Sequence, residues 1–254
     1  MLKIENSKFL LNQQIVLYYI LYEEYMIEKI ISIDRNLFFA INGTHSYFTD
    51  CALWLYSGTI IWIPITLFMI GFIIYKKSWK EWLPILVAFV VLFFLCDKIT
   101  AEIIKPYFSR LRPTHDPNIM EHVHTLHQYI GGMYGFVSSH SANAFGMALF
   151  SSFLFKNKLY TFVIIMWALI MGYSRIYLGV HYVSDVLGGM IIGAIIGYMT
   201  YLFYSISIKK LSKKTNYVKL ATYTPVSVKM LAFVIMSYIV LFSLLSPFLI
   251  DFLK

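Results

Sequence analysis

Charged side chains are scarce in this chain. Asp, Glu, Lys and Arg together make up 13% of its 254 residues, whereas hydrophobic residues make up 59%. Soluble globular domains carry about a quarter charged residues and are about half apolar. With a mean hydropathy of +0.69, the composition excludes an ordinary soluble enzyme. It predicts an all-α integral membrane protein, a polytopic helix bundle rather than several globular domains.

Cysteine is almost absent as well. The two cysteines, Cys51 and Cys96, lie in or beside apolar segments and share no C-x-x-C spacing. This argues against a disulfide framework or a cysteine-based metal site, and we expect two free thiols that serve in packing. The chain also lacks internal repeats and low-complexity tracts. Its first 25 residues have no small-residue cleavage site, so we expect no cleaved signal peptide.

Acidic residues are fewer than basic ones, 13 against 21, which gives a net charge of +8. In a soluble protein such an excess would suggest nucleic acid as the partner. Here the lysines cluster in short loops between apolar segments, as they do in the cytoplasmic loops of membrane proteins. We therefore expect the bilayer to be the partner, and no nucleic acid.

Long apolar runs are what the chain has in abundance. Six of them come close to the ~20 residues that a helix needs to cross a bilayer. The second is expected to continue as a helix studded with polar residues as far as Lys105. The six runs cover residues 57–75, 82–96, 139–155, 159–176, 184–206 and 230–253.

The segment before these runs is expected to form an interfacial helix on the membrane surface. Apolar residues recur there at roughly helical spacing among charged ones. They are Ile27, Ile30, Ile31, Leu37 and Phe38. The dipeptide Asn42-Gly43 then predicts a turn.

The basic residues in the connections predict the orientation. The connections after the first, third and fifth runs are rich in lysine and almost free of acid. The positive-inside rule places them in the cytoplasm. The long connection at 106–136 and the turn at 174–185 then face the exterior.

The stretch from Ser174 to Asp185 places costly groups at the mouth of the membrane. Ionisable groups at membrane depth usually mark a functional site. His181 and Asp185 are four residues apart, so they share a face if a helix starts near Gly179. The carboxylate can then accept the Nδ1 proton of the imidazole and leave Nε2 free to attack or to exchange protons. Arg175 could hold an oxyanion in front of it. Alone, these groups could also simply pair at the membrane surface.

A second external segment carries two cations. Lys105 and Arg112 lie seven residues apart and have no adjacent acid to pair with, which favours an anionic ligand. A planar guanidinium is suited to holding two phosphate oxygens at once. The alternative is a pair of basic anchors for lipid headgroups.

A third external segment is a helix start. Ser138, Ser139 and His140 precede an apolar run, and free backbone N–H groups with the positive end of the helix dipole make such a start an anion site. Ser138 suits the N-cap position. His140 could donate a proton to a leaving oxygen, although a lone histidine near a helix start is more often a cap or a core hydrogen bonder.

Together the three segments resemble the signature of the type 2 phosphatidic acid phosphatases, a superfamily that also contains bacterial lipid-diphosphate phosphatases and vanadium haloperoxidases. The signature here reads Lys105-x6-Arg112-Pro113, then Ser138-Ser139-His140, then Ser174-Arg175-x5-His181-x3-Asp185. The resemblance covers about residues 27–207. It divides the chain into an N-terminal extension (1–26), a membrane phosphatase core (27–207), and a basic cytoplasmic loop with an additional transmembrane helix (208–254).

The resemblance implies a phosphatase without metal or other cofactor that works through a phosphohistidine. By analogy, His181 is the nucleophile and Asp185 its orienting carboxylate. His140 is the acid that protonates the leaving oxygen and later the base that activates water. The groups implied for binding the phosphoryl oxygens are Lys105, Arg112, Arg175, Ser138 and the N–H groups around Ser139. Such a set supplies the positioning and charge neutralisation that phosphoryl transfer needs.

Two features depart from this pattern. The second motif of the family usually reads Pro-Ser-Gly-His, whereas this chain has Val137 and Ser139 in place of the proline and the glycine. The long connection also carries His122-x-His124-x-x-His127, which could ligate a metal. Only Asp116 and Glu121 accompany these histidines, so a solvated loop is the favoured interpretation.

The expected function is removal of phosphate from a lipid phosphate or diphosphate at the external leaflet of the bacterial inner membrane. The outward site favours undecaprenyl diphosphate as the substrate. Lipid A phosphates, phosphatidylglycerophosphate and a lipid phosphotransferase reaction are the alternatives. A transporter would place charges near mid-span or break helices in matched halves, whereas these charges cluster at span ends on one face. A haloperoxidase is disfavoured because the chain is membrane-embedded.

Overall fold

The computed structural model describes residues 2–215 and 223–253, and within them every regular element is a helix. The predicted all-α fold is confirmed. In chain order the elements are α1 (Leu2–Asn42), α2 (Tyr47–Ser57), η1 (Ile60–Trp62), α3 (Ile63–Ile74), α4 (Trp79–Lys98), η2 (Ile99–Ile104), α5 (Lys105–Phe108), η3 (Pro113–His115), η4 (Met120–His122), α6 (Ser139–Phe155), α7 (Lys158–Tyr177), α8 (Val183–Thr215) and α9 (Pro225–Leu253).

Fewer helical stretches of the described chain have the length and apolar composition of a membrane span than the six runs predicted from the sequence. Among the described residues, four helical stretches are long and apolar enough to cross a membrane, namely Trp79–Phe108, Lys158–Tyr177, Val183–Leu211 and Pro225–Asp251. A fifth crossing results if α2 and Ile60–Ile74 count as one span bent by 71°. The predicted count of six is therefore not confirmed, and α6 is only 17 residues long.

The first predicted run, residues 57–75, is not one straight helix. Ser57 ends α2, and Gly58 caps it in an extended conformation with its N–H donating to the carbonyls of Trp54 and Leu55. A proline in the first turn of α3 then suits a helix start, because its missing N–H needs no partner there. Gly58 and Pro64 thus divide residues 57–75, which hydrophobic composition alone predicted to form one continuous helix.

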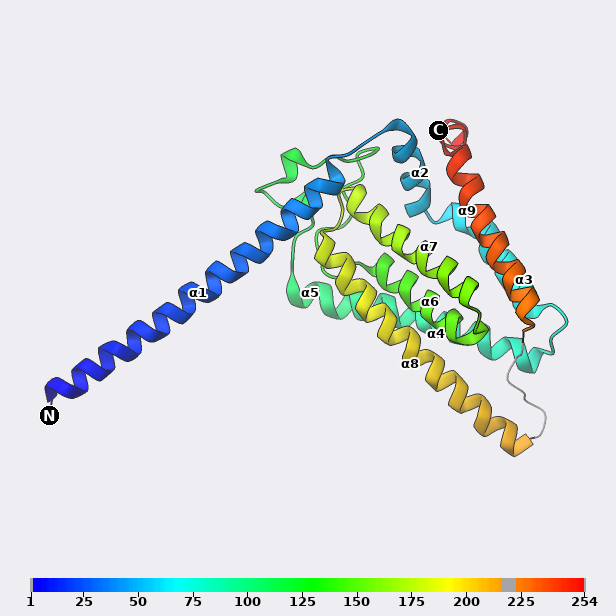
Figure 1. The fold of residues 1–254 in the computed structure, drawn as a ribbon, viewed down its shortest axis with the longest axis horizontal. Helices are drawn as coiled ribbons and strands as arrows, with labels where there is room; N and C mark the ends of the chain where they lie inside the picture. The colour runs from blue at the N-terminus through cyan, green and yellow to red at the C-terminus, as the bar shows by residue number, and fades with distance from the viewer. Residues whose placement is uncertain (1, 216–222, 254) are drawn as a thin grey trace.

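Helix α6 lies at the centre of the bundle and packs against α4, α7 and α8 (Figure 1). Glycines at every fourth position of α8 let its backbone approach that of α6, as small residues do in membrane helix pairs. They are Gly189, Gly193 and Gly197. A Cβ atom at Gly193 would lie 2.1 Å from the carbonyl oxygen of Ala142 on α6. This contact fixes the distance between α6 and α8, and the N-terminal ends of both helices lie at the candidate site.

Helix α1 extends away from the bundle, and its C-terminal part meets α7 and α8 (Figure 1). It ends at Asn42, where a turn was predicted, but it runs without a break through residues 26 and 27, where the extension was expected to end. Of the five apolar residues that predicted an interfacial helix, Phe38 is fully buried, whereas the other four are exposed. The interfacial position of this helix and the division into three regions stay predictions.

The additional C-terminal helix is an integral part of the bundle. Helix α9 packs along α2, α3 and α7, and its Val228, Leu231 and Phe242 side chains are buried. Both cysteines are buried and free, as predicted.

Candidate active site

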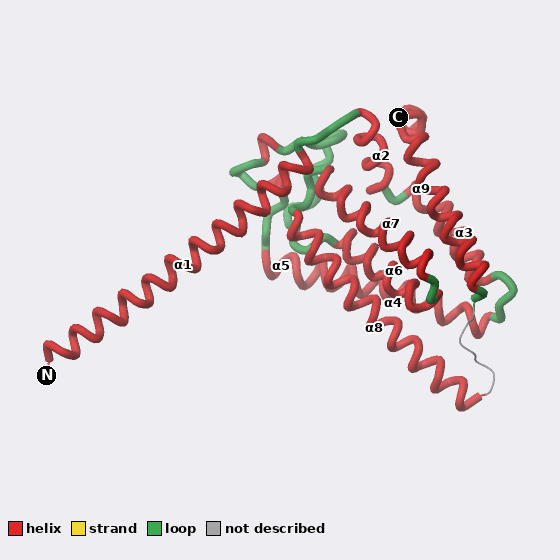
Figure 2. The backbone as a smooth tube through the Cα atoms, in the orientation of Figure 1, coloured by secondary structure: helices red, strands yellow, loops and turns green. Residues whose placement is uncertain are grey.

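The three predicted motifs meet at one end of the bundle. The C-terminal end of α7 and the start of α8 flank residues 178–182, the start of α6 lies beside them, and the chain after α5 crosses the same end. Figure 2 shows that the long connection between α5 and α6 lies at this end, near the end of α1. Residues distant in sequence are therefore gathered in one place by the helix packing.

His181 and Asp185 form the predicted pair. Their Nδ1 and Oδ2 atoms are 3.4 Å apart, and both side chains are buried. The same Oδ2 atom accepts a 3.0 Å hydrogen bond from the N–H of Tyr182. Gly179, with φ of +77°, makes the turn that presents the histidine, and a Cβ there would lie 2.7 Å from Val123. The turn at Gly179 thus places the carboxylate of Asp185 opposite the Nδ1 atom of His181.

Arg112 meets the other nitrogen of His181. Its Nη1 atom lies 3.2 Å from Nε2 and 3.2 Å from the carbonyl oxygen of Val180, while its Nε donates to the carbonyl of Tyr134. A guanidinium can only donate, so Nε2 is the acceptor and the proton of the neutral ring resides on Nδ1, facing Asp185. A phosphoryl group bound by Arg112 would therefore lie next to Nε2, and it would replace the hydrogen bond that Arg112 gives to the lone pair of Nε2.

The charge of His181 follows from its surroundings. Burial lowers its pKa well below the usual value of 6.5, and the nearby cations Arg112, Arg175 and Lys105 lower it further. Both effects act against the imidazolium form. The ring is therefore neutral at pH 7, which is the state that a nitrogen nucleophile needs.

Lys105 reaches the site through a change in helix geometry. The segment η2, between α4 and α5, is a π-helical turn, an irregularity that is frequent at functional sites. Lys105 Nζ donates to Ser139 Oγ at 2.9 Å, and Thr100 Oγ1 from the same turn lies 2.8 Å from that oxygen. The hydroxyl that replaces the glycine of the family motif thus belongs to a network with the predicted phosphate-binding lysine.

The start of α6 has the predicted N-cap. Ser138 is fully buried, and its side chain accepts from the N–H of Ser141 at 3.4 Å. Its own N–H donates to the backbone carbonyl of Asp185 at 2.9 Å, which fastens α6 to α8. His140 follows in the first turn, within electrostatic range of Lys105 and of the cations around His181. No described residue forms a hydrogen bond with its ring.

Arg175 is buried at the end of α7. It donates to the hydroxyl of Ser57 and, at 2.9 Å, to the phenol oxygen of Tyr129. Its Nε atom is buried and has no partner among the described residues. The eight predicted site residues therefore lie in or around one site, and Ser57, Thr100 and Tyr129 support them from segments that the motifs do not include.

The sequence interpretation missed a second set of charged groups beside Asp185. Arg110 donates to Asp185 Oδ1 at 2.9 Å and to Asp34 Oδ2 at 2.6 Å. Arg110 stands two residues before Arg112, and its position inside the first motif was a usable signal. Asp34 offered none, since it lies in α1, far from every motif.

The histidines of the long connection are not arranged as a metal site. Among the described residues, no group of three or more His, Cys, Asp or Glu side chains could hold a metal ion. The rings of His124 and His45 are tilted by 34° with their centroids 3.6 Å apart, and the ring of His127 lies 4.7 Å from that of Trp54. These histidines pack between the long connection and the segments around α2.

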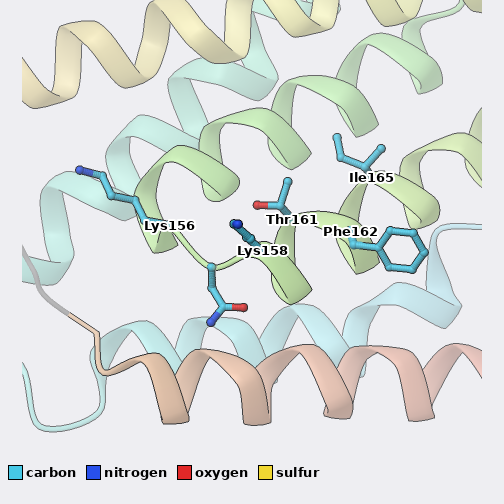
Figure 3. A pocket seen from close by; sticks show the side chains of 6 residues that line it. Lys156, Lys158, Thr161, Phe162 and Ile165 are labelled. Atoms are coloured by element: carbon cyan, nitrogen blue, oxygen red, sulfur yellow. The ribbon is translucent and has the colours of Figure 1, made fainter.

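A separate hollow of about 420 Å³ lies at the other end of α6, where the chain turns into α7 (Figure 3). Its lining residues are Lys156, Asn157, Lys158, Thr161, Phe162 and Ile165. None of the predicted site residues contributes to it. This hollow is therefore separate from the candidate active site.

This chain is similar in sequence and in fold to known proteins. Residues 83–209 match the PAP2 superfamily. The chain is 38% identical over 177 residues to the lipid A 4'-phosphatase of Porphyromonas gingivalis, which covers 70% of this chain and 75% of that protein. It is 35% identical over 185 residues to the lipid A 4'-phosphatase of Bacteroides thetaiotaomicron, which covers 72% and 81%. The crystal structure of a transmembrane PAP2-type phosphatidylglycerolphosphate phosphatase from Bacillus subtilis has a TM-score of 0.56 at 22% identity, covering 70% of this chain and 87% of that one.

Proposed function

Since this chain belongs to the PAP2 superfamily and is a multi-pass membrane lipid phosphatase, we propose that it removes phosphate from lipid A at the external leaflet. The two lipid A 4'-phosphatases similar to it, each covering 70% or more of the chain, support this substrate. They favour it over undecaprenyl diphosphate, which the outward orientation alone had suggested. The ester at the 4' position is the bond that we propose it cleaves.

One observation carries the proposed chemistry: the neutral imidazole of His181 is held between a carboxylate and a guanidinium. Asp185 faces Nδ1 at 3.4 Å and Arg112 faces Nε2 at 3.2 Å. The carboxylate stabilises the positive charge that grows on the ring as Nε2 forms a bond, and the guanidinium holds the group that is attacked. Preorganised charges of this kind usually supply the largest part of catalysis.

In the first step, Nε2 of His181 attacks the phosphorus and the bond from phosphorus to the lipid oxygen breaks. The bound phosphate anion offsets the charges of Arg175, Lys105 and Arg112 that act on His140, so this imidazole holds a proton in the complex. His140 gives that proton to the lipid oxygen, and the dephosphorylated lipid leaves. Lys105, Arg112 and Arg175 neutralise the equatorial oxygens, together with Ser138 and the N–H groups around Ser139 at the start of α6.

In the second step, water attacks the phosphorus of the phosphohistidine. His140, now neutral, takes a proton from the water, the phosphorus–nitrogen bond breaks, and its electron pair returns to Nε2. Inorganic phosphate leaves and both histidines regain their starting states. We place this reaction at the periplasmic face of the bacterial inner membrane, because the lysine-rich connections assign the opposite end of the bundle to the cytoplasm.

The test is phosphate release by the purified full-length chain in detergent micelles. The panel holds lipid A with phosphate at the 4' position alone, lipid A with phosphate at the 1 position alone, undecaprenyl diphosphate, phosphatidylglycerophosphate and phosphatidic acid. We expect the highest kcat/KM with the 4'-phosphate, and mass spectrometry should show the loss of one phosphate from that sugar. His181→Ala is expected to lower kcat by at least about 10³-fold without changing membrane insertion.

Each other outcome contradicts a defined part of the proposal. Preference for another lipid in the panel would overturn the substrate, and no phosphate release from any of them would overturn the phosphatase activity under these conditions. Turnover retained by His181→Ala would remove the nucleophile. Phosphate found on an added acceptor lipid instead of in solution would identify a phosphotransferase.

A further inference from the structure

Helix α1 lies outside the segment 83–209 that matches the family, yet it presents a buried stripe to the candidate site. The stripe consists of Asp34, Phe38 and Asn42, spaced by four residues and therefore on one face of the helix, with exposed fractions of 7%, 0% and 1%. The side-chain amide of Asn42 donates to the carbonyls of His124 and Tyr177 and accepts from the N–H of His124. The end of α1 is thus fixed against the connections that surround the site.

Asp34 is bonded to the same segment as the proposed nucleophile. Its Oδ1 atom accepts from the N–H of Ser184 at 3.0 Å, and its Oδ2 atom accepts from the Ser184 hydroxyl and, at 2.6 Å, from Arg110 Nη2. The other guanidinium nitrogen of Arg110, Nη1, donates to Asp185 Oδ1 at 2.9 Å. Arg110 is therefore shared between a carboxylate on α1 and the carboxylate beside His181.

This arrangement completes the surroundings of Asp185. Its Oδ2 atom serves Nδ1 of His181 and the N–H of Tyr182, so Arg110 is what holds Oδ1. Removing one member of a buried charge network leaves the others uncompensated. Without the Asp34 carboxylate, Arg110 keeps only its bonds to the Ser184 hydroxyl and to Asp185. Its hold on Oδ1 loosens, and the Asp185 carboxylate, still bonded to the N–H of Tyr182, can tilt relative to His181.

The neighbouring residue of α1 holds the opposite side of the same segment. Arg35 donates to Asp116 Oδ2 at 3.0 Å, and the hydroxyl of Tyr182 donates to that oxygen at 2.8 Å. The guanidinium of Arg110 lies over the ring of Tyr182, 4.3 Å from its centroid. Two consecutive residues of α1 thus fix the residues that follow His181.

We propose that Asp34 and Arg110 are positioning residues for phosphoryl transfer, with Asp34 acting through Arg110 on Asp185 and hence on the orientation of His181. The proposal rests on the proposed function, because it assigns these residues to the same reaction. It makes α1 part of the catalytic unit rather than an appendage of it.

The experiment compares Asp34→Asn, Arg110→Gln and the double variant with the wild-type chain, using the lipid that the wild type hydrolyses fastest. Asp34→Asn is expected to lower kcat roughly 10- to 100-fold, as loss of a supporting carboxylate partner does, while KM stays within about 2-fold because no group that touches substrate has changed. The double variant should lose no more than Arg110→Gln alone, because Asp34 acts through Arg110.

A second measurement separates positioning from a general structural defect. Vanadate inhibits by bonding to the nucleophile, whereas inorganic phosphate only occupies the anion site. Asp34→Asn should weaken inhibition by vanadate and leave inhibition by phosphate unchanged. Lys29→Gln, an exposed substitution on the same helix, is the matched control and should behave as wild type in every measurement.

Wild-type kcat in Asp34→Asn, or a double variant whose loss is the product of the two single losses, would overturn the inference and leave the proposed function standing. A wild-type chain that hydrolyses none of the lipids would instead contradict the proposed function. If Asp34→Asn does not fold, as judged by thermal melting in detergent, Arg110→Lys takes its place. Arg110→Lys keeps the positive charge but cannot bind Asp34 and Asp185 through two separate nitrogen atoms of a guanidinium. We therefore expect the same fall in kcat, and a wild-type kcat would overturn the inference.

Discussion

The Nε2 atom of His181 must be unprotonated to attack phosphorus, and its surroundings keep it so. Its pKa is lowered first by burial and then by Arg112, Arg175 and Lys105. A lowered pKa means that the reactive neutral form persists as the pH falls below 6.5. We therefore expect the acid limb of the pH profile of kcat/KM that belongs to His181 to lie below pH 6.5.

The measurement is kcat/KM for the preferred lipid between pH 4 and 9, with detergent and ionic strength held constant. Arg112→Gln removes one of the cations that repel the imidazolium, so its acid limb should move toward higher pH while its maximum rate falls. An acid limb at or above pH 6.5 in the wild type would contradict the assignment of a neutral, buried nucleophile.

The residues that could be predicted from the sequence are those whose spacing encodes their function. Ser138 stands directly before a helix, so local geometry predicted its N-cap position. The four-residue spacing predicted His181 and Asp185 on one face of a helix starting near Gly179, whereas α8 starts only at Val183 and His181 lies in the turn before it. The pair still forms, because that turn points the imidazole at the carboxylate. Asp34 could not be predicted in this way, because it is 150 residues from Ser184 and no helical spacing connects them. An aspartate among apolar residues of a surface helix indicates a solvated face, whereas this one is buried and accepts hydrogen bonds from three donor groups of Ser184 and Arg110.

At the scale of the elements, the contact between α6 and α8 determines the geometry of the site. Ser138 and Asp185 lie at the N-terminal ends of these two helices and are joined by a 2.9 Å backbone hydrogen bond. A Cβ at Gly193 would lie 2.1 Å from the carbonyl of Ala142, a backbone atom that cannot rotate away. Any side chain at this position must push the helices apart.

Gly193→Ala is therefore expected to destabilise the fold by about 1–3 kcal/mol, the usual cost of overpacking, and to lower activity because Ser138 moves relative to Asp185. Thermal melting and kcat in detergent are the measurements. Gly71→Ala in α3 is the matched control, because a Cβ there meets no atom within 4 Å, and it should melt at or slightly above the wild-type temperature. Equal behaviour of the two variants would show that the α6–α8 distance is not critical.

The elements were predictable where apolar runs end at charged or capping residues. Helix α6 covers the predicted residues 139–155, and the polar continuation of α4 to Lys105 is present as η2 and the start of α5. The bend between α2 and α3 was not predicted, because hydropathy averages over Gly58 and does not register the change in direction. The glycines of α8 carried a usable signal of close packing in their four-residue spacing, and the apolar content of the run obscured it.

At the scale of the whole molecule, three buried or half-buried cations and a helix start face the proposed phosphate position. They supply charge neutralisation that many phosphoryl-transfer enzymes obtain from magnesium. No described group of His, Cys, Asp or Glu side chains is arranged to bind a metal ion. Activity of the purified chain should therefore survive excess EDTA, with kcat within about 2-fold of the untreated protein, since electrostatic positioning remains intact.

Phosphate release before and after chelation measures this directly, with magnesium or zinc added back as the control. Loss of activity that either metal restores would contradict the prediction. It would also direct attention to the histidines of the connection between α5 and α6, which the structure shows packed against His45 and Trp54.

The bond between Asp34 and the segment after His181 also has a consequence for biosynthesis. Asp34 leaves the ribosome early, whereas Ser184 and Asp185 emerge some 150 residues later, when most of the bundle has been made. If Asp34 positions Arg110 as proposed, α1 waits through the insertion of the intervening helices before the last part of the site reaches it. A nascent chain that stops short of α8 would then hold Asp34, Arg110 and His181 but lack Asp185, and so could not yet attack the phosphates of the membrane into which it is being inserted.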